Sequence, residues 1–141
     1  SVYGPGAKLT NLISRFVNEA LTTDQIQHFG TGAEERQYIF VEDVVNASIN
    51  VASSQYNNKK VILLGSENVG LSDLMEMISS QLEKNIIKIF KKEEYGIHYK
   101  SSPFQTDPDG AIHYKLESPT PLKDGLKETI QFIHEQLSNQ S

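Results

Sequence analysis

The chain of 141 residues contains no cysteine, which excludes a disulfide framework and a thiolate metal site. It also lacks an excess of basic residues: 13 Lys and Arg stand against 18 Asp and Glu, and the net charge is −5. A general nucleic-acid surface is therefore disfavoured, because it needs clustered cations. No apolar run approaches the ~20 residues that span a bilayer, and nothing resembles a signal peptide. We expect a cytoplasmic protein that has neither a membrane nor a nucleic acid as its partner.

Two signatures of nucleotide-dependent enzymes are missing as well. No Gly-x-Gly-x-x-Gly follows a predicted strand, because Gly30-Thr31-Gly32 continues without a third glycine into two glutamates that would repel a pyrophosphate. One Tyr-x-x-x-Lys sequence exists, from Tyr56 to Lys60, but it lies in a polar turn rather than on a helix. Four histidines are scattered without metal-ligand spacing. We therefore expect no catalytic residue, no metal site and no bound dinucleotide in this chain alone.

The apolar pattern alternates between helical and extended periodicity. It predicts helices over about 9–21, 43–53, 72–82 and 122–137, and strands over 25–29, 35–41, 61–64 and 86–90. This alternation favours an α/β class with a small mixed sheet and helices. Positions 91–121 hold four of the five prolines and are predicted to be irregular. Such a long stretch is usually a functional or disordered loop, and we expect it to close over a ligand.

Three of these elements carry more specific expectations. Asp43 and Ser72 are each expected to cap the helix that follows. The helix after Asp43 is apolar on more than one side and is expected to be well buried. The apolar run at 61–64, closed by Gly65, is typical of a strand that is buried on both faces.

The most informative segment surrounds Arg36. It follows the glycine-rich turn 30–32 and precedes the strand-like run 38–41. A guanidinium fixed between a turn and a strand would aim a planar, permanently charged fork into a cleft, and arginine pairs bidentately with phosphate. The alternative is an ordinary surface ion pair with a neighbouring glutamate.

Together with other motifs, this segment resembles one family, the extended short-chain dehydrogenase/reductases that epimerise, dehydrate or reduce nucleotide sugars. The matching runs are Val2-Tyr3-Gly4-Pro5-Gly6, Asn11-Leu12, Gly30 to Arg36, Tyr38 to Val44, Leu64-Gly65-Ser66 and Leu122 to Ile130. The resemblance covers nearly the whole chain. It implies the substrate-binding C-terminal portion, residues 1–141, of a longer protein whose N-terminal Rossmann half is not part of this sequence.

The resemblance also implies what the parent protein does. It would be an NAD- or NADP-dependent nucleotide-sugar epimerase, dehydratase or reductase that acts as a homodimer, and this chain would contact a nucleotide-diphosphate sugar. The alternative is a non-catalytic relative that binds a nucleotide sugar or a protein partner.

Site residues follow from the same resemblance. The implied substrate-binding residues are Arg36, Asn11, Leu12, Gln27, Phe29, Tyr3 and Lys100, and Tyr3 and Gly4 are also implied to lie at the cofactor. Phe29 would offer an aromatic face to the base, although it could equally be a core residue, and Asn11 could equally be a helix cap. A second phosphate-binding arginine is expected before the last helix, but Ser-Ser-Pro occupies 101–103, and Lys100 is the nearest cation. Gln37 stands where the family usually has aspartate.

Overall fold

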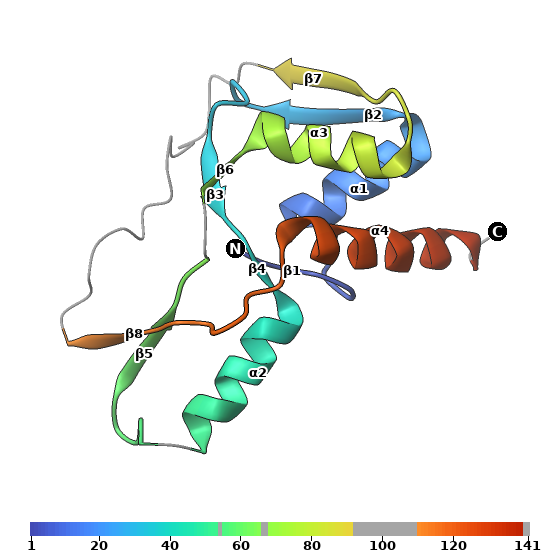
Figure 1. The fold of residues 1–141 in the computed structure, drawn as a ribbon. Helices are drawn as coiled ribbons and strands as arrows, with labels where there is room; N and C mark the ends of the chain where they lie inside the picture. The colour runs from blue at the N-terminus through green and yellow to red at the C-terminus, as the bar shows by residue number, and fades with distance from the viewer. Residues whose placement is uncertain (54, 66–67, 92–109, 140–141) are drawn as a thin grey trace.

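The computed structural model describes residues 1–53, 55–65, 68–91 and 110–139. In this part of the chain four helices alternate with eight short strands (Figure 1). The helices are α1 (Leu12–Thr23), α2 (Val41–Ala52), α3 (Leu71–Leu82) and α4 (Leu122–Ser138). The strands are β1 (Val2–Tyr3), β2 (Gln25–Phe29), β3 (Glu35–Gln37), β4 (Ile39–Phe40), β5 (Lys60–Leu63), β6 (Asn68–Gly70), β7 (Ile87–Lys91) and β8 (Ala111–Tyr114).

The described strands form four separate two-stranded pairs. Three pairs are parallel, β1 with β4, β2 with β7 and β5 with β8, whereas β3 and β6 are antiparallel. Helices lie between the strands along the chain, because parallel neighbours need a crossover connection. The predicted α/β class with mixed strand directions is therefore confirmed.

The core lies between α1, α3, α4 and the β2–β7 pair (Figure 1). Apolar residues at helical spacing face it from each helix, as a one-sided amphipathic stripe requires. Its fully buried side chains include Ile13, Phe16, Val17, Ala20, Leu74, Met75, Ile78 and Leu126. Figure 1 shows α2 and the β5–β8 pair extending away from this core.

Tyr3 connects the first strand to the last helix inside the core. Its hydroxyl donates to the carbonyl of Leu122 at 3.4 Å, and its ring lies 5.6 Å from that of Phe40. A Cβ atom at Gly125 would stand only 2.2 Å from the Tyr3 hydroxyl oxygen. A glycine at this position of α4 therefore permits the close approach of the helix to Tyr3.

Neither predicted helix cap is correct. Helix α2 begins at Val41, so Asp43 lies in its first turn, where its carboxylate accepts hydrogen bonds from the Thr120 backbone N at 2.8 Å and hydroxyl at 2.9 Å. Asp43 thus joins α2 to the segment before α4 instead of capping its own helix. Ser72 likewise lies in the first turn of α3, whose N-cap is Gly70.

The burial predicted for α2 and for 61–64 is wrong. Ala47 is the one buried residue of α2, while Val45 and Ile49 are 51% and 60% exposed. The apolar side chains of α2 are spread around the helix, because successive residues turn by about 100°, so neighbours on one side cannot cover them all. Strand β5 is only half-buried, since its described partner is β8 alone.

The predicted strand 35–41 is divided at Tyr38, and this division positions Arg36. Before Tyr38 the chain pairs antiparallel with β6, and after it the chain pairs in parallel with β1. Arg36 therefore lies in a short strand, β3, opposite Val69. The irregular stretch predicted for 91–121 contains one strand, β8, while its positions 92–109 lie outside the described residues.

Candidate nucleotide-binding site

The first element of the site is the beginning of α1. Asn11 is its N-cap: the Oδ1 atom accepts from the backbone N of Ile13 at 3.1 Å and of Ser14 at 3.4 Å. Its Nδ2 donates to the carbonyl of Val2 at 2.8 Å. Both ends of the amide therefore hold the scaffold together, and the cap alternative accounts for these contacts. Leu12, the first residue of α1, is half-buried.

The second element is the glycine-rich turn, which closes around Glu34. The carboxylate of Glu34 accepts from the backbone N of Thr31 at 2.8 Å, from the Thr31 hydroxyl at 3.0 Å and from the backbone N of Gly32 at 2.8 Å. Burial alone would raise the pKa of Glu34, but these hydrogen bonds outweigh it and lower the pKa to about 2. His28 lies beside the carboxylate, with Nε2 at 3.6 Å. The glutamate that would repel a pyrophosphate thus has an internal structural role.

The same turn caps α3. The carbonyl of Gly32 accepts from the backbone N and the hydroxyl of Ser72, both at 3.0 Å, and the carbonyl of Glu34 accepts from the backbone N of Leu71 at 3.0 Å. Since helix N-termini leave N–H groups without intrahelical partners, these carbonyls satisfy the start of α3. The turn that precedes Arg36 is therefore fixed to the core.

A cavity of about 290 Å³ is lined by residues of α1, β2, β3 and the first residue of α3. Three residues predicted to bind the nucleotide line it: Leu12 from α1, Phe29 from β2 and Arg36 from β3. Its other lining residues are Ser1, Arg15, His28 and Leu71. Ligand pockets commonly have volumes of ~300–1,000 Å³, so this cavity matches the lower end of that range.

Arg36 is half-buried at the edge of this cavity. Its Nη1 donates to the carbonyl of Glu35 at 2.8 Å. Burial raises the pKa of the neighbouring Tyr38, and the positive charge of Arg36 opposes that rise. The charge of Arg36 therefore acts on the buried phenol of Tyr38.

The remaining predicted residues lie elsewhere or adjacent to the cavity. Gln27 precedes the lining residues of β2, and its backbone forms hydrogen bonds with Arg15 and Glu19 of α1. Tyr3 and Gly4 are buried outside the cavity lining, and a Cβ atom at Gly4 would stand 2.6 Å from Val41 Cγ1. Lys100 lies outside the described residues.

Four lining residues were not predicted to bind the ligand, namely Ser1, Arg15, His28 and Leu71, and Arg15 is the cation among them. It lies on α1 one turn after Leu12, and side chains three residues apart share one side of a helix. That spacing was the available signal. Its Nη1 donates to the carbonyl of Gln27 at 3.0 Å and to Glu19 Oε1 at 3.0 Å.

Comparison with protein families relates this geometry to known proteins. The model of the NAD dependent epimerase/dehydratase family matches residues 1–65. The predicted family resemblance is confirmed. The matched segment contains every residue that lines the cavity except Leu71.

Curated proteins of the same kind are similar to nearly the whole chain. A UDP-N-acetyl-alpha-D-glucosaminuronate decarboxylase of Bacillus cytotoxicus is 29% identical over 96% of this chain and 44% of its own length. A UDP-glucuronate 4-epimerase of Thermodesulfobacterium geofontis is 28% identical over 97% of this chain and 42% of its own. The chain thus spans less than half the length of these curated relatives.

Solved structures of epimerases share the fold. The UDP-glucose 4-epimerase of Thermotoga maritima with UDP-glucose matches with a TM-score of 0.79 at 20% identity, covering 97% of this chain and 44% of that one. The UDP-glucuronic acid 4-epimerase of Bacillus cereus, in complex with UDP-glucuronic acid and NAD, matches with a TM-score of 0.78 at 20% identity, covering 96% and 43%. At this identity the comparison establishes the fold.

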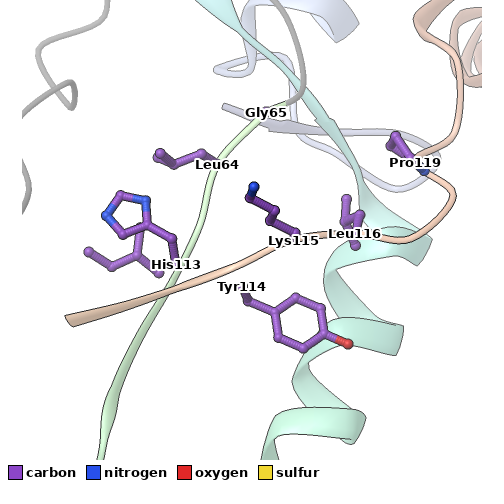
Figure 2. A pocket seen from close by; sticks show the side chains of 8 residues that line it. Leu64, Gly65, His113, Tyr114, Lys115, Leu116 and Pro119 are labelled. Atoms are coloured by element: carbon purple, nitrogen blue, oxygen red, sulfur yellow. The ribbon is translucent and has the colours of Figure 1, made fainter.

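A second cavity, of about 330 Å³, lies between β5, β8 and the segment after β8 (Figure 2). Its lining residues are Ile62, Leu64, Gly65, His113, Tyr114, Lys115, Leu116 and Pro119. Two of them, Leu64 and Gly65, belong to a run that matches the family, but none of the described residues predicted to bind substrate or cofactor lines this cavity. The two cavities therefore lie at different places in the fold, and only the first combines the predicted nucleotide-binding residues.

Among the described residues, no group of three or more His, Asp or Glu side chains is arranged to hold a metal ion. Helices long and apolar enough to cross a membrane are likewise absent from the described ranges.

Proposed function

We propose that this chain is the nucleotide-sugar-binding portion of an NAD- or NADP-dependent epimerase, dehydratase or reductase. One observation carries the proposal: Leu12, Phe29 and Arg36, implied by resemblance to bind the same ligand, come from three elements and line one cavity. The curated relatives support the ligand class, because each of those described above is named for a UDP-linked sugar acid.

Each lining residue offers a distinct interaction. The ring of Phe29 provides a face on which a nucleotide base can stack, and the side chain of Leu12 provides apolar contact. The guanidinium of Arg36 provides a charged fork that suits a diphosphate. Lys100 remains a further proposed phosphate contact.

The cofactor would be held mainly by the rest of the protein. A nicotinamide dinucleotide would supply the hydride chemistry there, while this chain binds and orients the sugar nucleotide. The contact of Tyr3 and Gly4 with the cofactor stays a prediction of the resemblance, since both residues are buried here and the Tyr3 hydroxyl packs against α4.

The coverage of the relatives extends the proposal to the whole protein. We infer a longer cytoplasmic protein in which an N-terminal Rossmann half carries the cofactor and the catalytic residues, and which assembles as a homodimer. Residues 1–141 alone would then bind no dinucleotide and have no turnover.

The test is substitution of Arg36 in the full-length protein. Arg36→Ala should weaken binding of a nucleoside diphosphate by about 2 kcal/mol, the worth of a charge-assisted hydrogen bond. Arg36→Lys should restore only part of this loss, because a lysine offers a point charge rather than a fork. Titration calorimetry with UDP, GDP and dTDP measures the effect.

Lys127→Ala is the matched control, since it removes one exposed positive charge from α4, away from the cavity lining. It should leave the affinity unchanged. Equal affinity of wild type, Arg36→Ala and Arg36→Lys would show that Arg36 is a surface ion-pair residue and would reject the proposed site. Arginine-dependent binding without turnover of any sugar nucleotide would instead favour the non-catalytic relative.

A further inference from the structure

Two arginines line the nucleotide cavity. Arg15 comes from α1 and Arg36 from β3. Arginine side chains stay protonated at all physiological pH values. Two permanent cations at a cavity of about 290 Å³ raise each other's electrostatic energy. A bound polyanion would lower that energy.

Arg15 is already held in a fixed orientation. Its Nη1 bonds Glu19 and the Gln27 carbonyl, and its guanidinium carbon lies 5.0 Å from the centre of the Phe16 ring. Glu19 Oε2 in turn accepts from the Gln27 backbone N at 2.9 Å. This network attaches the arginine to both α1 and β2, so little side-chain entropy is left to lose on binding.

The guanidinium nevertheless retains donors for a ligand. Both hydrogen bonds of Arg15 use Nη1, and within the described ranges Nε and Nη2 make none. Its side chain is 32% exposed, and the pair with Glu19 is an i,i+4 pair on a helix surface. A ligand anion can therefore accept from Nε or Nη2 while Nη1 stays bonded to Glu19 and Gln27.

We propose that Arg15 binds a phosphate of the nucleoside diphosphate together with Arg36. This inference rests on the function proposed above and defines how the site recognises its ligand. It also accounts for a departure in the sequence, because Ser-Ser-Pro at 101–103 replaces the second arginine that the family resemblance implies. Arg15 supplies that second fork from α1 rather than from the segment before α4.

The experiment measures selectivity for a diphosphate over a monophosphate in the full-length protein. UDP, GDP and dTDP are titrated first, and the tightest binder is compared with its own monophosphate. Arg15→Gln should weaken diphosphate binding about tenfold and monophosphate binding much less, which reduces the selectivity. Arg15→Lys keeps the charge without the fork and should lie between wild type and Arg15→Gln, and it replaces Arg15→Gln if that variant does not fold.

Glu19→Gln separates phosphate binding from a structural role of Arg15. This variant removes the negative charge beside Arg15 but keeps the cation and an amide oxygen that can accept from the Gln27 backbone N, so diphosphate affinity should fall much less than in Arg15→Gln. If Arg15 only ties α1 to β2, Arg15→Gln and Glu19→Gln will each weaken diphosphate binding and monophosphate binding equally. That result overturns the inference. If substitution of Arg36 weakens diphosphate binding and substitution of Arg15 does not, this inference alone is overturned. If substitution of Arg36 leaves diphosphate affinity unchanged, the proposed function is overturned.

Discussion

Replacing Gly32 with alanine is expected to destabilise the full-length protein by about 3 kcal/mol. Gly32 has a φ of +84°, where an L side chain costs about 1–2 kcal/mol. The new Cβ atom would also stand 2.4 Å from the Ser72 hydroxyl oxygen and 2.5 Å from the ring of Phe90. Moving Ser72 breaks its hydrogen bond to the Gly32 carbonyl, which adds about 1 kcal/mol. Urea unfolding measures the loss.

Gly6 provides a matched control, because its φ is +82° and no atom lies within 4 Å of a Cβ atom built there. Gly6→Ala should therefore cost only the backbone term, about 1 kcal/mol. The difference between the two variants isolates the contacts of the turn with α3. Equal losses would mean that Ser72 and Phe90 move aside without cost.

Glu34→Gln is expected to lower the free energy of unfolding by about 3 kcal/mol. The buried carboxylate accepts three hydrogen bonds from Thr31 and Gly32. The amide oxygen can still accept both bonds from Thr31, but the amide nitrogen faces the Gly32 N–H, which loses its acceptor, and the two remaining bonds lose the charge that strengthens them; together these losses amount to about 3 kcal/mol. Glu35→Gln, at the exposed next position and the first residue of β3, should change stability by less than about 0.5 kcal/mol.

The effect of Glu34→Gln should also depend on pH. The pKa of Glu34 falls from 4.5 to about 2 on folding, so the ionised carboxylate stabilises the protein fully above pH 4.5. That contribution disappears as the pH falls from 4.5 toward 2. Unfolding measured over this range should show the wild type converging on Glu34→Gln. A constant difference between them would show that the charge of Glu34 is not what stabilises the turn.

Local pattern predicted many of the elements. Strand β2 has the predicted bounds 25–29, and α4 begins at Leu122 as predicted, because periodicity and breaker residues act over a few positions. Burial was predicted less well. The apolar residues of α2 favour burial, but whether a neighbour covers them depends on segments that are distant in the sequence. The division of the predicted strand at Tyr38 also depends on distant segments, because β3 pairs with β6 whereas β4 pairs with β1.

The site residues, too, were predicted where a local motif marks them and missed where only the fold brings them together. Family motifs pointed to Leu12, Phe29 and Arg36, and the fold brings these three to one cavity. Arg15 belongs to no such motif, so only its position relative to Leu12 on α1 could have indicated it. Asn11 and Tyr3 belong to motifs, but their hydrogen bonds serve a helix N-terminus and the core. A motif therefore identifies a segment more reliably than it identifies which side chain meets a ligand.

The four strand pairs also determine how the chain must reach this fold. None of the described pairs joins consecutive strands: the shortest separation is that of Gln37 and Asn68, and the β2–β7 pair spans more of the chain. The described pairs therefore include no hairpin that could act as a rapid local nucleus, and each of them requires closure of a long loop before its hydrogen bonds form. Topologies dominated by such distant contacts fold slowly. During synthesis β2, the strand that carries Phe29, leaves the ribosome well before its partner β7. Because β7 follows α3 in the chain, the β2–β7 pair cannot form until α3 has been made.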